Sequence, residues 1–257
     1  MSHWLDHFST EYYLEGWIPV TQLITSKEEL PTVEKFGGYR PFLSKGETWP
    51  LDNNGTSMIF VGQFKDPAHE DDSMLRIFMK DHLNDDDYEI SKILKVNKVT
   101  VKPELLADNY SDIINDAHAI GKTNKSYPCY LIEQWKQVKE LNEAKLIEDL
   151  GKDRHAVIEG NTMKDQLLQD SEDFEIDEDS IYEFINDAEY DTRSNTGFKW
   201  YGYPTDWQGS EMSKYYMEHG YCFQWDTYEN NNFSWMWQDA GLIYINPKSL
   251  EVTDSSA

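Results

Sequence analysis

A few histidines and carboxylates in this chain have spacings that could support metal chemistry. His3 and His7 stand four residues apart with Asp6 between them, so a helix would place two metal ligands on one face. No third ligand can be identified near them. The acids that alternate between Asp173 and Asp179 are spaced like calcium ligands, but Glu178 stands where such a loop needs glycine. We therefore expect no metal and no cofactor.

The cysteines give no nucleophilic site either. His219 lies three residues before Cys222, but residues three apart on a regular strand point to opposite faces and cannot form a dyad. Cys129 and Cys222 are far apart and match no metal or redox motif, which favours a reducing compartment. The sequence has no serine elbow and no glycine-rich phosphate loop with lysine. These features favour a protein that is not an enzyme.

Charge is the most informative feature of the composition. The 23 basic and 48 acidic residues leave a formal net charge of −25. Such a charge repels nucleic acids and anionic membranes, and it speeds encounters with basic partners. Residues 172–191 are the most acidic stretch, with ten carboxylates in twenty positions. A capping box from Ser180 to Glu183 predicts a short helix there, with one apolar and one negative face.

We interpret this stretch as a partner-binding surface, although acidity for solubility alone would give the same pattern. Two tyrosines, Tyr215 and Tyr216, would add aromatic anchors if they are exposed. The predicted binding carboxylates are Glu172, Asp173, Glu175, Asp177, Glu178, Asp179, Glu183 and Asp187.

The chain must fold around a core of its own to position such a surface. Its 257 residues include 39% hydrophobic and 14% aromatic side chains, too many for a disordered chain. The N-terminus lacks a basic region followed by an apolar run, and no stretch approaches a membrane span. We therefore expect a cytoplasmic protein that binds no membrane.

Local patterns predict β structure at both ends and helices in the middle. Residues 58–64, 74–79, 221–226, 233–237 and 241–245 are expected strands, with His69–Asp72 as an exposed connection. Pro103 favours a helix running to about Ile120. Apolar residues on one stripe between Pro128 and Leu150 predict a second helix, and residues 155–170 a third.

The two ends repeat the same order of features. Gly37-Gly38-Tyr39-Arg40-Pro41 is followed by a strand that contains Gln63, and Gly202-Tyr203-Pro204 by one that contains Gln224. Each glutamine could read a ligand, but we favour a structural role in which its amide holds a neighbouring turn.

The same motifs resemble the YwqG-like family. The opening signature is Lys35-Phe36-Gly37-Gly38, Trp49-Pro50 and Phe60-Val61-Gly62-Gln63, and the closing one includes Phe223-Gln224-Trp225-Asp226 and Gly241-Leu242-Ile243-Tyr244-Ile245. One extra residue before Pro41, and Gln238 in place of a usual glycine, depart from the pattern. The resemblance implies an α+β fold of antiparallel β-sheets from two internally duplicated β units, with helices inserted between them. It implies no catalytic residues, and the proximity of bacterial members to polymorphic toxin systems suggests immunity proteins.

We therefore expect a single domain over residues 1–257. It would comprise a first β unit at about 33–80, a helical and acidic insert at about 100–191, and a second β unit at about 197–250. The expected function is that of an immunity protein, a monomer that binds a basic toxin domain in a 1:1 heterodimer and blocks its cleft. The toxin would be a nuclease or an ADP-ribosyltransferase. The alternatives are a small-molecule-binding or hydrolytic enzyme with a pocket between the β units, and a housekeeping acidic interaction scaffold.

Overall fold

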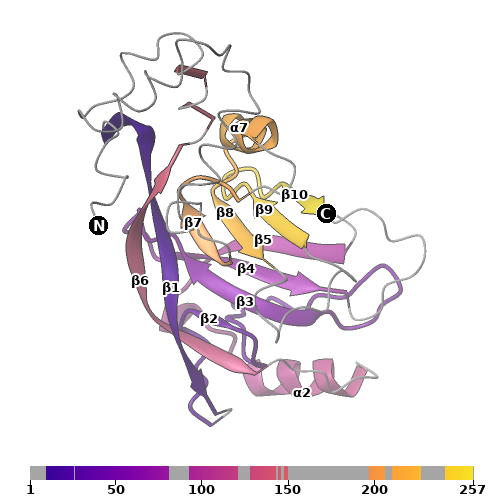
Figure 1. Ribbon diagram of the computed structural model, residues 1–257. Coiled ribbons are helices and arrows are strands. Elements are labelled where there is room, and N and C mark those ends of the chain that lie inside the picture. Colours follow the sequence, from indigo (N-terminus) through magenta and orange to yellow (C-terminus); the bar gives the residue numbers. More distant parts are fainter. Residues whose placement is uncertain are drawn as a thin grey trace, which may run out of the picture.

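The described strands form one antiparallel sheet. The computed structural model describes residues 10–25, 27–80, 93–120, 128–142, 144–145, 148–149, 197–205, 210–226 and 241–256. Within these ranges the sheet has ten strands in the order β10-β9-β8-β7-β1-β6-β2-β3-β4-β5 (Figure 1). The strands are β1 (Tyr13–Ile24), β2 (Lys35–Phe36), β3 (Ile59–Lys65), β4 (Ser73–Met79), β5 (Leu94–Thr100), β6 (Cys129–Leu141), β7 (Lys199–Tyr201), β8 (Phe223–Asp226), β9 (Gly241–Ile245) and β10 (Val252–Ser256).

The order of the strands is symmetric about the pair β1 and β6. These two long strands are antiparallel from Tyr13↔Leu141 to Ile24↔Cys129, with one irregularity between Val20 and Thr21. On one side lies the first half-sheet, β6-β2-β3-β4-β5, and on the other the second half-sheet, β1-β7-β8-β9-β10. The innermost strand is exchanged between the two half-sheets. β1 pairs with β7 of the second series, and β6 pairs with β2 of the first.

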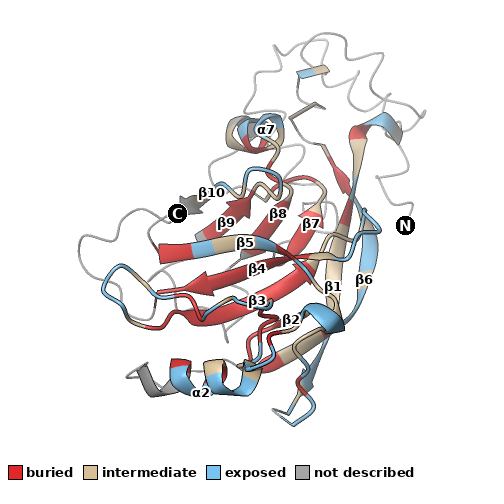
Figure 2. Ribbon diagram, turned by 180° about the vertical axis from the view of Figure 1, so that it is seen from behind, coloured by how far each residue is buried: buried red, intermediate tan, exposed pale blue. Residues whose placement is uncertain are grey.

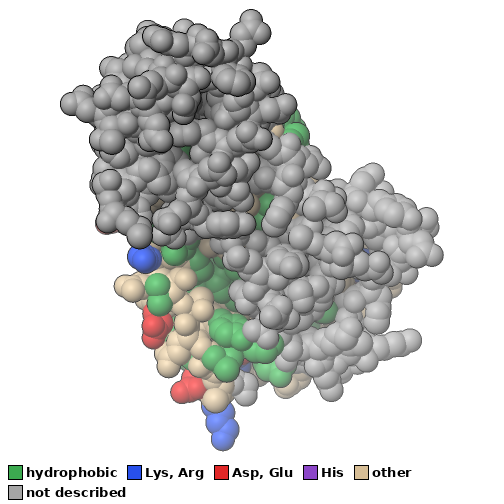
Figure 3. Space-filling model, viewed as in Figure 1, with side chains coloured by type: hydrophobic (Ala, Val, Ile, Leu, Met, Phe, Trp, Pro, Cys, Tyr) green, Lys and Arg blue, Asp and Glu red, His purple; other side chains and the backbone are tan. Residues whose placement is uncertain are grey.

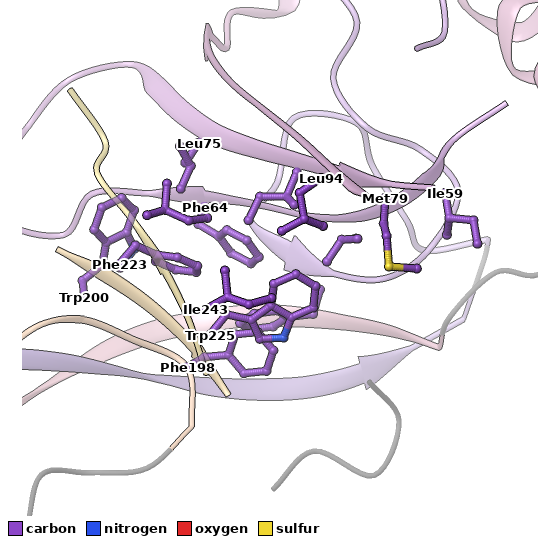
Figure 4. Packing of buried hydrophobic residues seen from close by; sticks show 14 of the residues in the cluster. Ile59, Phe64, Leu75, Met79, Leu94, Phe198, Trp200, Phe223, Trp225 and Ile243 are labelled. Atoms are coloured by element: carbon purple, nitrogen blue, oxygen red, sulfur yellow. The ribbon is translucent and has the colours of Figure 1, made fainter. Parts of the chain in front are cut away.

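The two half-sheets share one hydrophobic core. Side chains from β3 and β4, among them Phe64 and Leu75, belong to the same buried cluster as Phe223, Trp225 and Ile243 from β8 and β9 (Figure 4). β3, β4, β8 and β9 are buried along most of their length, whereas β1 and β6 are mostly half-buried or exposed (Figure 2). This shared core explains why strands far apart in the sequence have continuous apolar runs.

A short helix covers the outer face of each half-sheet, which explains why β3, β4 and β9 are buried on both faces. Ile114 and Ala117 of α2 (Tyr110–Ile120) pack with Phe60 and Phe78. Tyr216 of α7 (Ser210–Glu218) packs with Leu242 and Tyr244. The two helices lie at opposite ends of the described structure (Figures 1 and 2). None of the helices in the described ranges is long and apolar enough to cross a membrane.

The expected α+β class is wrong. The described chain is mostly antiparallel sheet, and its two α-helices, α2 and α7, are short, with 11 and 9 residues. The helix predicted from Pro128 to Leu150 is instead the strand β6 over residues 129–141. Pairing with β1 along its whole length overrides the local preference of its Leu, Glu, Gln and Lys residues for helix.

Other local predictions can be compared with the structure directly. The strands at residues 58–64, 74–79 and 241–245 are confirmed as β3, β4 and β9, with residues 69–72 exposed between the first two. The expected strand at 221–226 is confirmed over 223–226. The helix expected from Pro103 is divided into a 3-10 turn, Pro103–Leu105, and α2. The expected elements at 155–170, 172–191 and 233–237 lie outside the described residues.

Candidate functional site

A buried ion pair holds the turn after β2. Lys35 and Glu29 are both fully buried, with Nζ 3.1 Å from Oε1. Glu29 Oε1 accepts the backbone N–H of Tyr39 and Arg40 at 2.9 and 2.6 Å. Lys35 Nζ donates to the Arg40 carbonyl at 2.7 Å. A Cβ at Gly38, whose φ is +82°, would collide with the Glu29 carboxylate, so the turn requires glycine there.

The same arrangement recurs after β7. Lys199 Nζ lies 2.9 Å from Glu140 Oε2, and both side chains are buried. Glu140 Oε2 accepts the N–H of Tyr203 at 2.7 Å, and Lys199 donates to the Tyr203 carbonyl. Gly202 has φ +75° and faces the Glu140 carboxylate as Gly38 faces Glu29. Glu29 lies after β1, the first strand of the series β1–β5. Glu140 lies near the end of β6, the first strand of the series β6–β10.

The two glutamines occupy matching places beside these turns. Gln63 Oε1 accepts the N–H of Phe42 at 2.8 Å, while its Nε2 donates to the carbonyls of Pro31 and Val33 at 2.7 and 2.6 Å. Gln224 Oε1 likewise accepts the N–H of Thr205 at 2.8 Å, and its Nε2 donates to the Gly197 carbonyl.

Both amides are therefore used within the fold, as the structural interpretation predicted. The correspondence extends to the next strand. Arg76 donates to the Phe42 carbonyl, and Tyr244 donates to the Thr205 carbonyl. The polar side chains of both turns therefore make their hydrogen bonds within the fold, which favours a structural role for the two turn sites.

One matching position differs between the turns. Gly37, with φ 67°, follows Phe36, whereas Tyr201, with φ 56°, follows Trp200. A tyrosine in the left-handed region is strained, and such strain persists only where the surroundings hold it. Tyr201 donates a hydrogen bond to Asp66, and its ring packs edge-on against Trp17 with centroids 5.6 Å apart.

His69 completes a small polar cluster at the seam between the half-sheets. Its Nδ1 lies 2.9 Å from Asp66 Oδ2 and 3.3 Å from the Tyr201 hydroxyl. Burial and the hydrogen bond to Asp66 raise the pKa of Tyr201, so the hydroxyl remains a donor. Sequence inspection missed this cluster because Asp66 and Tyr201 are far apart in the chain. The tyrosine at a position where the other turn has glycine is a signal that could have found it.

The predicted carboxylates, Glu172 to Asp187, lie outside the described residues. Of the two predicted anchors, Tyr215 is 42% exposed on α7. Tyr216 is 1% exposed and stacks on Tyr244 with ring centroids 3.9 Å apart. Tyr216 thus holds α7 against β9, and its side chain does not reach the surface where a partner could touch it.

The chain that leads into the acidic stretch contacts α7. Glu148 Oε2 lies 4.0 Å from Nζ of Lys214, the neighbour of Tyr215. The exposed tyrosine therefore lies close to the point where the chain enters residues 151–196. The most acidic stretch, residues 172–191, begins 24 residues after Glu148 and lies outside the described residues.

The cysteines and potential metal ligands give no alternative site in the described residues. Burial raises the pKa of the Cys129 thiol to about 12 and also raises that of Cys222, which disfavours reactive thiolates. Cys222 Sγ donates to the Gly220 carbonyl at 3.1 Å. Within the described ranges no group of three or more His, Cys, Asp and Glu residues could hold a metal ion. His3 and His7 lie outside these ranges.

Comparison with known families agrees with the extent of the fold. The model of a domain family of unknown function, DUF1963, matches residues 34–254. The match spans the second turn site, the first one apart from Glu29, and all strands but β1 and the last residues of β10. The chain belongs to this family. No curated protein matches the sequence.

Proposed function

We propose that this protein works by binding a basic protein partner. The observation that carries the proposal is the charge of −25, with ten carboxylates within residues 172–191. That charge would accelerate association with a basic surface and make it sensitive to salt. In the face drawn in Figure 3, the described part is mainly hydrophobic or uncharged, with acidic side chains standing singly.

We further propose that the partner is a toxin domain and that the protein is an immunity protein of the YwqG-like type. Toxins that act on nucleic acids or on NAD often have basic clefts, which an acidic surface could occupy. The proposal places a monomer in the cytoplasm, bound to its toxin in a 1:1 complex. Its support is the charge, the exposure of Tyr215 on α7, and the resemblance of the sequence motifs.

An affinity capture with two matched variants tests the proposal. One variant neutralises four acids of the stretch by Glu175→Gln, Asp177→Asn, Glu178→Gln and Asp179→Asn. The control neutralises four exposed acids elsewhere by Glu70→Gln, Glu104→Gln, Asp112→Asn and Asp116→Asn. Both variants change the net charge equally.

We expect the wild type and the control to retain one basic protein stoichiometrically from cells that carry the toxin loci. The variant at 175–179 should lose it, as should the wild type in high salt. The captured protein should also lose its toxic activity when bound. Capture of no basic protein, or equal losses by both variants, would contradict the proposal.

A further inference from the structure

The exposed face of α7 carries an aromatic pair formed by Tyr215 and His219. The ring of Tyr215 stacks on His219 with centroids 3.9 Å apart and an interplanar angle of 32°. His219 Nδ1 lies 2.9 Å from the Tyr215 carbonyl oxygen, which fixes the imidazole in place. Both residues are exposed, in contrast to Tyr216, which faces the core. The pair is therefore an ordered, exposed stack of two rings on a helix.

Carboxylates lie around this pair. Glu218 is exposed and three residues after Tyr215, which places it on the same side of the helix. Glu251 is also exposed and accepts a hydrogen bond from Tyr221, whose ring packs against that of Tyr216, the residue after Tyr215. Burial, with Glu251 and Tyr215, raises the pKa of Tyr221 to about 12, so its hydroxyl is neutral. The nearby Lys214 has Glu148 as its counter-ion.

An exposed aromatic face bordered by carboxylates favours one kind of cation. A guanidinium is planar and weakly hydrated, so it can stack on a ring while its N–H groups donate to carboxylates. A lysine ammonium is strongly hydrated and lacks the planar fork. The pair and its carboxylates should therefore favour arginine over lysine, whereas net charge alone would attract both.

We propose that the Tyr215–His219 pair, with Glu218 and Glu251, binds an arginine side chain of the protein partner. The inference rests on the proposed function, because a basic partner supplies the arginine. The partner would thus make two contacts, one with the predicted acidic stretch and one with α7. The acidic stretch would provide long-range attraction, and α7 would recognise the side chain.

Peptide binding tests this inference without knowledge of the partner. The probes are fluorescein-labelled hexa-arginine and hexa-lysine, with affinity measured by fluorescence anisotropy at one fixed salt concentration. The wild-type protein is compared with Tyr215→Ala, Tyr215→Phe and Leu23→Ala. Leu23 is 61% exposed near the far end of β1, so its truncation controls for loss of an exposed apolar side chain. Circular dichroism verifies that each variant is folded.

We expect the wild type to bind hexa-arginine more tightly than hexa-lysine. Tyr215→Ala should weaken arginine binding roughly two- to thirtyfold, the range for cation–π contacts, and leave lysine binding unchanged. Tyr215→Phe and Leu23→Ala should bind both peptides as the wild type does. Equal affinity for the two peptides, or equal loss of both with Tyr215→Ala, would overturn the inference. Either result would leave the capture experiment, and thus the proposed function, to be judged separately.

Discussion

Tyr201 donates a hydrogen bond to Asp66 and so ties β7 of the second half-sheet to the turn that follows β3 in the first. The tyrosine does this from a left-handed backbone conformation, where the matching turn has Gly37. The strained conformation is thus coupled to a contact between the halves. Substitutions at position 201 can therefore measure the effects of the backbone strain and of the side-chain contact on stability separately.

At position 201 a glycine variant should be more stable than an alanine variant, which is the reverse of the usual order. Tyr201→Gly removes both the contact and the strain, whereas Tyr201→Ala removes only the contact, so the glycine variant should be more stable by about 1 kcal/mol. Tyr201→Phe should lose about 1–2 kcal/mol through the missing hydrogen bond to a carboxylate. Urea denaturation measures these differences. Gly37→Ala is the matched control, and its free energy of unfolding should fall by about 1 kcal/mol. If Tyr201→Ala were as stable as Tyr201→Gly, the backbone at Tyr201 would not be strained.

The buried ion pairs should be much more sensitive than those at the surface. Lys199→Met leaves Glu140 charged and buried, which should lower the free energy of unfolding by roughly 3–5 kcal/mol. Combining it with Glu140→Gln should cost less than the sum of the single changes, because the double variant holds no unpaired charge.

Lys98→Met is the control for the ion-pair prediction. Lys98 pairs with Asp71 at 3.3 Å at the surface, and its loss should change stability by less than about 1 kcal/mol. Additive effects at positions 199 and 140 would show that the pair is not coupled. The comparison is best made by chemical denaturation at pH 7.

Gln63 should tolerate no carboxylate, although glutamate has the same shape. In Gln63→Glu the two carbonyls of Pro31 and Val33, which now accept Nε2–H, would face an oxygen without a proton. The introduced glutamate should have a raised folded-state pKa, so the variant should be least stable above about pH 5 and recover towards acid. Stability curves at several pH values measure this, and a variant equally destabilised at all pH values would contradict it.

Glu34 should make stability fall as pH rises. Burial raises its pKa, and hydrogen bonds from Trp135 and Lys65 oppose the shift only in part. A raised folded-state pKa favours the protonated form, so the contribution is present below about pH 4.3 and is lost as pH rises through the folded pKa. Glu34→Gln should remove this part of the pH dependence measured by denaturation.

Glu28 provides a control of opposite sign for Glu34. Hydrogen bonds from Thr25 lower the pKa of Glu28, which is exposed. Its contribution should therefore be present above its unfolded pKa and be lost as pH falls. The difference between wild type and Glu28→Gln should grow towards neutral pH. If Glu34→Gln and Glu28→Gln altered the pH profile in the same direction, the assignment for Glu34 would be wrong.

Apolar runs and turn motifs were sufficient to predict several strands but not the sheet. β3 and β4 are continuous apolar segments next to clear turns, and such segments are readable locally. β6 was mistaken for a helix because its exposed residues are good helix formers, and only its partner β1 makes it a strand. β1 itself has few alternating residues and was missed.

Only some of the residues that hold the two turns could be predicted from the sequence. Gln63 and Gln224 stood out through their matched spacing, and Lys35 and Lys199 precede their glycine turns in the same way. Their acidic partners could not be chosen, because Glu140 lies 59 residues before Lys199 and is one of 48 acidic residues. Only the folded sheet brings the two together.

The crossing of β1 and β6 between the half-sheets determines when each half can be completed during synthesis. When residues 35–100 leave the ribosome, their half-sheet still lacks β6, which ends at Leu141. β1 is made first, yet it gains its second neighbour only when β7 appears, at residues 199–201. The nascent chain must therefore keep an unpaired strand edge for most of its translation, and a chaperone that shields exposed edges should act on it until the last third has emerged.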